Sequence, residues 1–193
     1  MHYLIWAPAV LLCEVILIQA LGCSRDSSFM PENGVPISTQ IPASVQAVIP
    51  TLQFECQALI TGGNIQAIGD LNIDLQIWRP QESTGTFYNL VWMRPFRMRS
   101  GSGGSGTDAL VNASFTSNPG VPVRPGDVIG FHSLVSPRLL FDTSEQHEVY
   151  YLEAGQGPLC NFSLNGIGVR HTTIPLPFIS LTYGEYFIDI ILL

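Results

Sequence analysis

The fold is decided by the stretch LNIDLQIW, which spans residues 71 to 78. The odd-numbered residues of this stretch are aliphatic (Leu71, Ile73, Leu75, Ile77), and the even-numbered residues are largely polar (Asn72, Asp74, Gln76, Trp78). Successive side chains of a β-strand point to opposite faces, whereas a helix would scatter both sets around its axis. The alternation therefore predicts a strand with one buried face, and Pro80 is expected to end it.

Shorter strand-like runs lie on both sides of this segment. Residues 52–60 alternate in the same way, and Thr61-Gly62-Gly63-Asn64 is expected to break that strand. Further runs of strand length occupy residues 87–93, 109–116, 128–134, 138–141, 148–152 and 178–183. Seven or eight short strands with Gly/Pro punctuation predict an all-β, antiparallel β-sandwich of jelly-roll or immunoglobulin-like type.

Composition and charge narrow the class of protein. The chain has 193 residues, of which 46% are hydrophobic, so it can form one domain with a real core and is not globally disordered. All eight basic residues are arginine, and the absence of lysine excludes P-loop and Schiff-base chemistry. The formal net charge of -7 disfavours nucleic acid as a partner. No motif predicts a catalytic residue, a metal site or a cofactor.

The N-terminal segment predicts entry into the secretory route. Residues 1–22 are apolar and end in Ala20-Leu21-Gly22, the small-x-small pattern of a signal peptide, so cleavage after Gly22 is expected. The alternative is an uncleaved signal-anchor, which would attach the protein to the cell surface. Residues 23–47 are Pro- and Ser-rich and predict a linker, residues 48–183 the sandwich domain, and residues 184–193 a C-terminal tail or last strand.

Cysteines and sequons fit an extracellular domain. Cys56 and Cys160 lie near opposite ends of the predicted domain, and an oxidising compartment favours a disulfide between them, the alternative being two buried free thiols. Cys23 has no obvious partner. Asn112 and Asn161 each begin an N-x-S sequon and are candidate glycosylation sites. Asn112 alternates with apolar neighbours, so it is expected on the exposed face of its strand.

Three residues of the decisive strand are candidate ligand contacts. By alternation, Trp78 is expected on the same face of the strand as Asp74 and Gln76. An exposed tryptophan beside polar groups is typical of lectin-like surfaces. The alternative is that Trp78 stacks on Arg79 or lies beneath the linker or the second sheet. Asp127 follows Pro125-Gly126, and its carboxylate is expected to accept backbone N–H bonds from residues just beyond the turn.

The chain also resembles a known family. The fragments that carry the resemblance are Phe54-Glu55-Cys56, residues 75–80, Phe87-Tyr88, residues 124–130, Tyr150-Tyr151 and residues 177–180. In this order they resemble an uncharacterised extracellular β-sandwich module that recurs in surface and secreted proteins of sponges and other early-branching animals. The resemblance covers roughly residues 48–183 and implies a sandwich fold and an extracellular location. The module has no established activity that could be transferred to individual residues.

These observations predict a secreted or cell-surface, non-catalytic recognition or adhesion domain. Its expected partner is an extracellular protein or glycan, and membrane contact is expected only if the leader is an uncleaved anchor. A carbohydrate-binding, lectin-like module is the alternative, and a secreted hydrolase is the less favoured one, since it would require a carboxylate pair or a histidine in a cleft.

Overall fold

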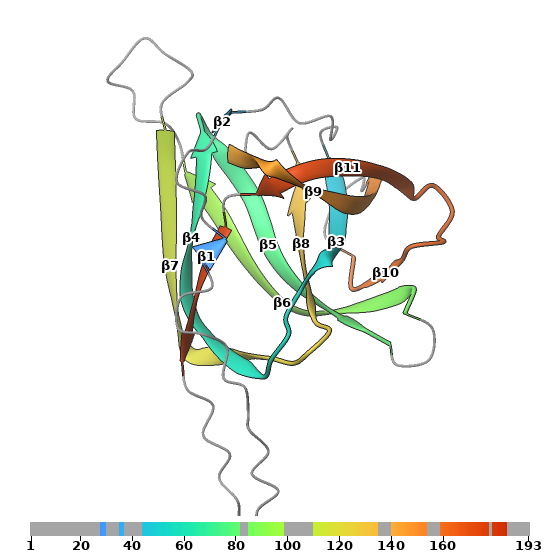
Figure 1. Ribbon diagram of the computed structural model, residues 1–193, viewed down its shortest axis with the longest axis horizontal. Coiled ribbons are helices and arrows are strands. Elements are labelled where there is room, and N and C mark those ends of the chain that lie inside the picture. Colours follow the sequence, from blue (N-terminus) through green and yellow to red (C-terminus); the bar gives the residue numbers. More distant parts are fainter. Residues whose placement is uncertain are drawn as a thin grey trace, which may run out of the picture.

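The structure, a computed structural model, describes residues 28–29, 35–36, 44–81, 85–98, 110–134, 140–153, 159–177 and 179–184. Every regular element within these ranges is a β-strand, and all strand pairs are antiparallel. The strands form two sheets (Figure 1). The predicted all-β, antiparallel β-sandwich is therefore confirmed.

Twelve strands make up the two sheets. They are β1 (Ser28–Phe29), β2 (Val35–Pro36), β3 (Val45–Gln53), β4 (Ala58–Ile68), β5 (Leu71–Pro80), β6 (Phe87–Met98), β7 (Leu110–Val123), β8 (Val128–Ser133), β9 (Leu140–Glu153), β10 (Asn161–Ser163), β11 (Arg170–Pro177) and β12 (Ile179–Gly184). The small sheet has the order β1-β12-β4-β7, and the large sheet has the order β10-β6-β5-β8-β3-β9-β11, with β2 added against β9.

The main core lies between the two sheets. The aliphatic side chains of β5 face this core, and each is at most 2% exposed; they are Leu71, Ile73, Leu75 and Ile77. Side chains of the small sheet meet it from the other side, among them Ile60, Ile65 and Phe115. Near the rim, the ring of Phe115 lies 5.6 Å from that of Phe96 on β6, in an edge-to-face arrangement. This face of β5 is buried as the alternation predicts.

The predicted strand break at Gly62-Gly63 is wrong. Both glycines lie inside β4, where the pairing with β7 shifts register between Ile60 and Gly62. A Cβ atom on Gly62 would lie 2.7 Å from the carbonyl oxygen of Phe115 on the neighbouring strand. The glycine is therefore needed for close approach of two strands at a bulge, not for a turn.

The sheet begins earlier than the expected linker boundary at residue 47. β3 starts at Val45, and Val45, Gln46 and Ala47 are all fully buried. Two short pieces of the expected linker also pair with the domain, since β1 pairs with β12 and β2 with β9. The predicted signal peptide at residues 1–22 lies outside the described residues, as does the tail after Gly184.

The large sheet carries a second, smaller core on its other face. Trp78 contacts the edge of Phe162, with ring centroids 6.0 Å apart, and Val48, Tyr88 and Val128 complete the buried cluster. Gly130 lies beneath the indole ring, because a Cβ atom there would be 2.6 Å from Trp78 Nε1 and 2.4 Å from the carbonyl oxygen of Ala47. The central strand β5 is thus covered on both faces.

Candidate functional site

The predicted ligand contacts lie together on one face of β5, but they are buried. Trp78 and Gln76 are 0% exposed and Asp74 is 4% exposed. The expectation of an exposed, lectin-like Trp78 with Asp74 and Gln76 beside it is therefore wrong. The physical reason is that Phe162 of β10 and its neighbours Leu164 and Val169 pack against this face of the sheet. A sugar ring cannot stack on an indole that is already covered.

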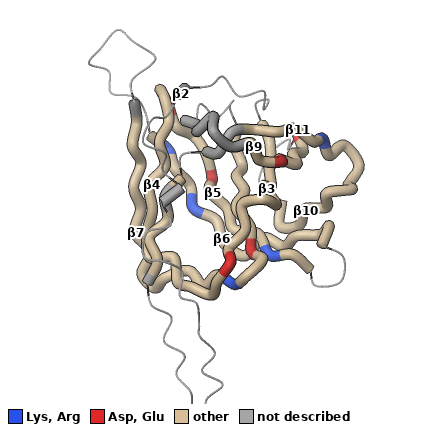
Figure 2. Tube along the Cα trace, in the orientation of Figure 1, with Lys and Arg blue, Asp and Glu red and all other residues tan. Residues whose placement is uncertain are grey.

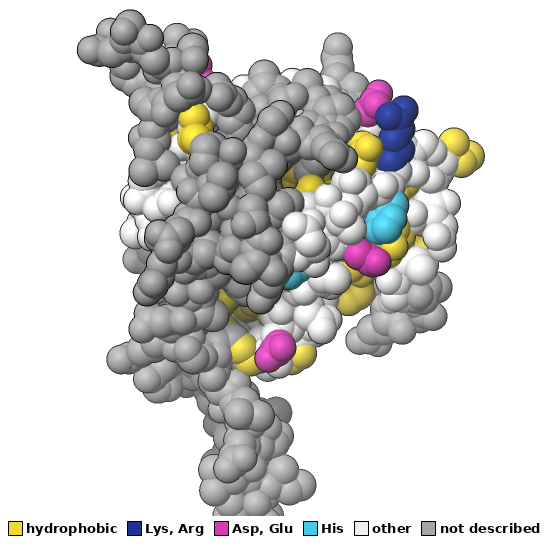
Figure 3. Space-filling model, turned by 45° about the horizontal axis from the view of Figure 1, so that its top comes forward, with side chains coloured by type: hydrophobic (Ala, Val, Ile, Leu, Met, Phe, Trp, Pro, Cys, Tyr) yellow, Lys and Arg dark blue, Asp and Glu magenta, His cyan; other side chains and the backbone are white. Residues whose placement is uncertain are grey.

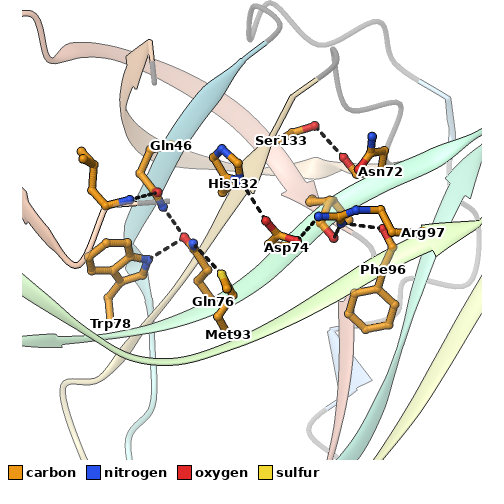
Figure 4. A network of polar contacts seen from close by, with 12 residues as sticks. Gln46, Asn72, Asp74, Gln76, Trp78, Met93, Phe96, Arg97, His132 and Ser133 are labelled. Atoms are coloured by element: carbon orange, nitrogen blue, oxygen red, sulfur yellow. Dashed lines mark hydrogen bonds and ion pairs between the residues drawn. The ribbon is translucent and has the colours of Figure 1, made fainter. Parts of the chain in front are cut away.

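Two glutamines connect this face to the covering segment (Figure 4). Gln76 Oε1 accepts hydrogen bonds from Gln46 Nε2 and, at 3.2 Å, from Trp78 Nε1. Gln76 Nε2 points to the sulfur of Met93 at 3.7 Å. Gln46 Oε1 accepts the backbone N–H of Leu159 at 3.0 Å, which ties the start of the covering segment to β3. This chain of amides satisfies buried polar groups that would otherwise oppose folding.

Asp74 lies at the centre of a second polar group (Figure 4). Its Oδ2 is 2.8 Å from His132 Nδ1 on β8, and its Oδ1 accepts a hydrogen bond from Arg97 Nη2 on β6 at 2.5 Å. Arg97 Nη1 also donates to the carbonyl oxygens of Ile73 and Phe96, each at 2.9 Å. The carboxylate therefore links three adjacent strands. We refer to Gln46, Asp74, Gln76, Arg97 and His132 as the polar cluster.

No described residue forms a hydrogen bond with the second ring nitrogen of His132, although His132 is only 3% exposed. An aspartate on Nδ1 orients a histidine in the way that acid–base catalysts use. However, no serine, threonine or cysteine of the described residues contacts Nε2, and these residues contain no group of three or more potential metal ligands. The geometry supports a role for the pair in holding β8 to β5.

Asp127 has the structural role that the turn predicts, but with different donors. Its Oδ2 accepts the backbone N–H of Arg124 at 2.9 Å, from before the turn and not from beyond it. Both carboxylate oxygens also accept hydrogen bonds from Arg79, each at 2.8 Å, and Asp127 is 1% exposed. The hydrogen bonds that Arg79 donates to the carboxylate of Asp127 raise the pKa of Arg79. This bidentate pair fastens the end of β5 to the turn before β8.

The predicted disulfide between Cys56 and Cys160 is wrong. Cys160 is exposed and its thiol is free. It lies beside β10, and β6, β5 and β8 separate β10 from β3, whereas Cys56 lies in the connection from β3 to β4. Cys56 is itself disulfide-bonded, and Cys13 and Cys23 lie outside the described residues.

Both sequon asparagines are exposed. Asn112 lies on β7 with its side chain in solvent, while Ala113 is 1% exposed, so the predicted register of this strand is confirmed. Asn161 is exposed at the start of β10, although its neighbour Phe162 is buried in the second core. Each asparagine is accessible to a modifying enzyme.

Strand β6 exposes apolar side chains that the sequence did not single out, and its register places Met93, opposite Gln76, and Met98, opposite Leu71, on different faces of the sheet. Phe87, Val91, Met93 and Met98 are each 38–45% exposed. β6 pairs with β5 along its length, but its other side pairs only with the three residues of β10. Within the described parts of the chain, residues 91–98 therefore pair with no second strand, although the rings of Trp92 and Phe96 contact Phe115 of β7. Pro95 and two arginines in this run are the signal that could have predicted an edge strand.

Charged residues are sparse along the described part of the chain (Figure 2). Exposed acidic, basic and histidine side chains of β9 and β11 gather on one side of the space-filling view (Figure 3). Among them, Arg170 Nη1 lies 3.3 Å from Glu153 Oε1, and His171 Nε2 lies 3.9 Å from Glu148 Oε1. β6 differs, because its sequence holds two arginines and no acidic residue.

Comparison with known proteins finds no matching family model, no matching curated protein and no matching solved structure. The described residues also contain no helix with the length and hydropathy needed to cross a membrane.

Proposed function

We propose that the chain is a secreted or cell-surface, non-catalytic recognition domain whose partner is an extracellular protein. The observation that supports this most is the row of exposed apolar side chains on β6. A strand edge that exposes large apolar side chains beside unpaired backbone groups can pair with another chain. The resemblance of residues 48–183 to extracellular modules of sponges and other early-branching animals points to the same class.

The alternative of a glycan partner has lost its main support, because Trp78, Asp74 and Gln76 are buried. Of the described residues with exposed large apolar side chains, only Phe87 is aromatic; the others are Val91, Met93, Met98, Leu134, Leu159 and Ile167. Stacking on a sugar ring needs an accessible aromatic face. We therefore favour a protein partner over a carbohydrate.

The full chain, expressed and secreted by animal cells, tests this proposal on a panel of displayed extracellular proteins and on a glycan array. We expect specific binding to one or more proteins and none to glycans. A variant with Val91→Thr, Met93→Thr and Met98→Thr keeps strand propensity but removes exposed apolar side chains, and it should lose binding. Ile167→Thr is the matched control, because Ile167 is fully exposed away from β6. Equal loss in both variants, or binding to glycans alone, contradicts the proposal.

Secretion has its own chemical signatures. We propose cleavage after Gly22, N-glycosylation at Asn112 and Asn161, and a disulfide between Cys56 and Cys23, the one unassigned cysteine that would remain after cleavage. N-terminal sequencing of the secreted chain should begin at Cys23. Enzymatic removal of N-glycans should lower its mass at both sequons, and a non-reducing peptide map should link Cys56 to the N-terminal peptide. An unprocessed, unglycosylated and fully reduced chain would contradict secretion.

A further inference from the structure

The longer strands at the open edges of the sheets, within the described structure, differ in what they expose. β7 exposes Asn112, Ser114 and Thr116, while β11 exposes Arg170 and His171. β6 alone combines exposed large apolar side chains with arginines and no acid. An edge strand offers unpaired backbone N–H and C=O groups, and a partner strand can add to them.

The charges of this edge point to the chemistry of the added strand. Arg94 is exposed and pairs with no carboxylate of the described residues. Arg97 donates three hydrogen bonds, to Asp74 and to two carbonyl oxygens, so among the described residues its Nε–H and one Nη2–H have no acceptor. Its side chain is 47% exposed, so these donors can reach a ligand. Both arginines therefore favour carboxylates.

Register sets the spacing of those carboxylates. Arg94 lies opposite Leu75 and Arg97 lies opposite Asn72, on the two different faces of β5. The arginines thus project from opposite faces of the sheet, three residues apart along β6. A strand added to β6 would meet them with acidic residues at positions i and i+3. Pro95, between them, offers no backbone N–H, so the hydrogen bonds of the new ladder come from its neighbours.

We propose that residues 91–98 of β6 are a strand-addition site for an extended segment of a partner protein, with apolar side chains and two carboxylates at positions i and i+3. This inference rests on the proposed function and names the surface and the chemistry of the partner. A second copy of this chain is a poorer occupant, because pairing two β6 edges would bring four arginines together without new acids. Like charges across a ladder are destabilising.

The direct test uses labelled nine-residue peptides of alternating threonine and valine with Glu at positions 4 and 7, and fluorescence anisotropy with the full chain. Matched peptides carry Gln at the same positions, or Glu at positions 4 and 6. We expect the first peptide to bind about fivefold more tightly than either control, since each exposed ion pair adds modestly. Methylating alternate backbone nitrogens should abolish binding, because it removes the ladder. Hydrogen exchange should slow at residues 91–98.

Variants of the chain locate the site. Arg94→Glu should reverse the preference between the Glu peptide and a Lys peptide, and thermal melting should confirm an intact fold, because Arg94 forms no ion pair with the part of the chain that the structure describes. Arg124→Glu makes the same charge change at another exposed position and should leave binding unchanged. Equal affinity for all peptides, binding that survives backbone methylation, protection of β7 or β11, or self-association of the chain through β6 would each overturn the inference.

The two proposals fail in different ways. If the chain binds extracellular proteins and Arg94→Glu binds them equally well, strand addition at β6 is wrong and the recognition function stands. If the chain binds no extracellular protein while the peptide preferences appear as expected, β6 is a strand-addition site and the proposed extracellular function is wrong.

Discussion

The two faces of β5 are both buried, but by different means. The face with Leu71, Ile73, Leu75 and Ile77 lies against the small sheet, where aliphatic side chains need only volume and shape. The other face is covered by the segment around Phe162, and its polar groups need specific partners from β3, β6 and β8. Hydrophobic burial is non-directional, whereas a buried amide or carboxylate requires a donor at a fixed place. The polar face therefore defines which strands lie beside β5 and in which register.

The largest loss of stability is expected when the indole ring of Trp78, on the second face of β5, is removed. Trp78→Ala should lower the free energy of unfolding by about 4 kcal/mol, because it leaves a cavity above Gly130 and removes the contact with Phe162. Urea titration measures the loss, and Leu75→Ala, at about 3 kcal/mol, is the reference on the other face. A loss below about 1 kcal/mol for Trp78→Ala would mean an exposed tryptophan.

The next effect comes from the carboxylate at the centre of the polar cluster. Asp74→Ala should cost about 2 kcal/mol, since it leaves the buried His132 Nδ1 and one Arg97 donor without an acceptor. The estimate lies below that of a fully buried pair because the Arg97 side chain is 47% exposed. A double-mutant cycle with Arg97→Ala measures the coupling free energy between Asp74 and Arg97. Additive losses in the cycle would mean that the two side chains do not interact.

Replacing one glutamine sharpens the contrast between the faces. Gln76→Leu fills a similar volume with apolar atoms, yet it should cost about 1.5 kcal/mol by removing the acceptor of Gln46 Nε2 and Trp78 Nε1. Adding Gln46→Leu removes the unpaired Nε2 donor but also the acceptor of the Leu159 N–H, so the double variant should be no more stable than Gln76→Leu. Thermal and chemical melts of the single and double variants measure this. A double variant that is clearly more stable than Gln76→Leu would contradict the bond between Gln46 and Leu159.

The smallest effect is expected on the outer face of the small sheet, which is open to solvent. Asn112→Gln, in chain made without glycosylation, should change stability by less than about 0.5 kcal/mol. The neighbouring Ala113→Asp is the control, because Ala113 is 1% exposed and a carboxylate there has no place in the core. Comparable losses for both variants would place Asn112 inside the protein.

The sequence predicted the strand and its aliphatic face but not what covers the other face. Alternation over residues 71–78 reports local geometry, and it holds no information about a segment more than eighty positions along the chain. Trp78 was expected in solvent for that reason. The wrong pairing of Cys56 with Cys160 has the same origin, because strand order in the sheet follows from long-range packing. The glycines of β4 were misread as a turn because close strand approach and chain reversal both favour glycine.

The polar cluster combined a correct local prediction with a missing long-range one. Asp74 and Gln76 were placed on the correct face of β5, because period two requires it. Their partners Gln46, Arg97 and His132 come from three other strands, and no local pattern joins them. Asp127 was predicted as a turn residue from Pro125-Gly126, whereas its pairing with Arg79 depends on the approach of β5 to that turn.

The fit of the Trp78 ring over Gly130 makes the domain convertible into a receptor for small aromatic molecules. Trp78→Gly would leave a space shaped like an indole, with Gly130 as its floor and Phe162 at its edge. Gln76 Oε1, which accepts a hydrogen bond from the native indole ring, would accept one from the N–H of a free indole. Apolar cavities of this kind in protein interiors bind aromatic guests of matching size. Added indole should therefore raise the melting temperature of Trp78→Gly but not that of Leu75→Ala, which would place folding under the control of a soluble compound.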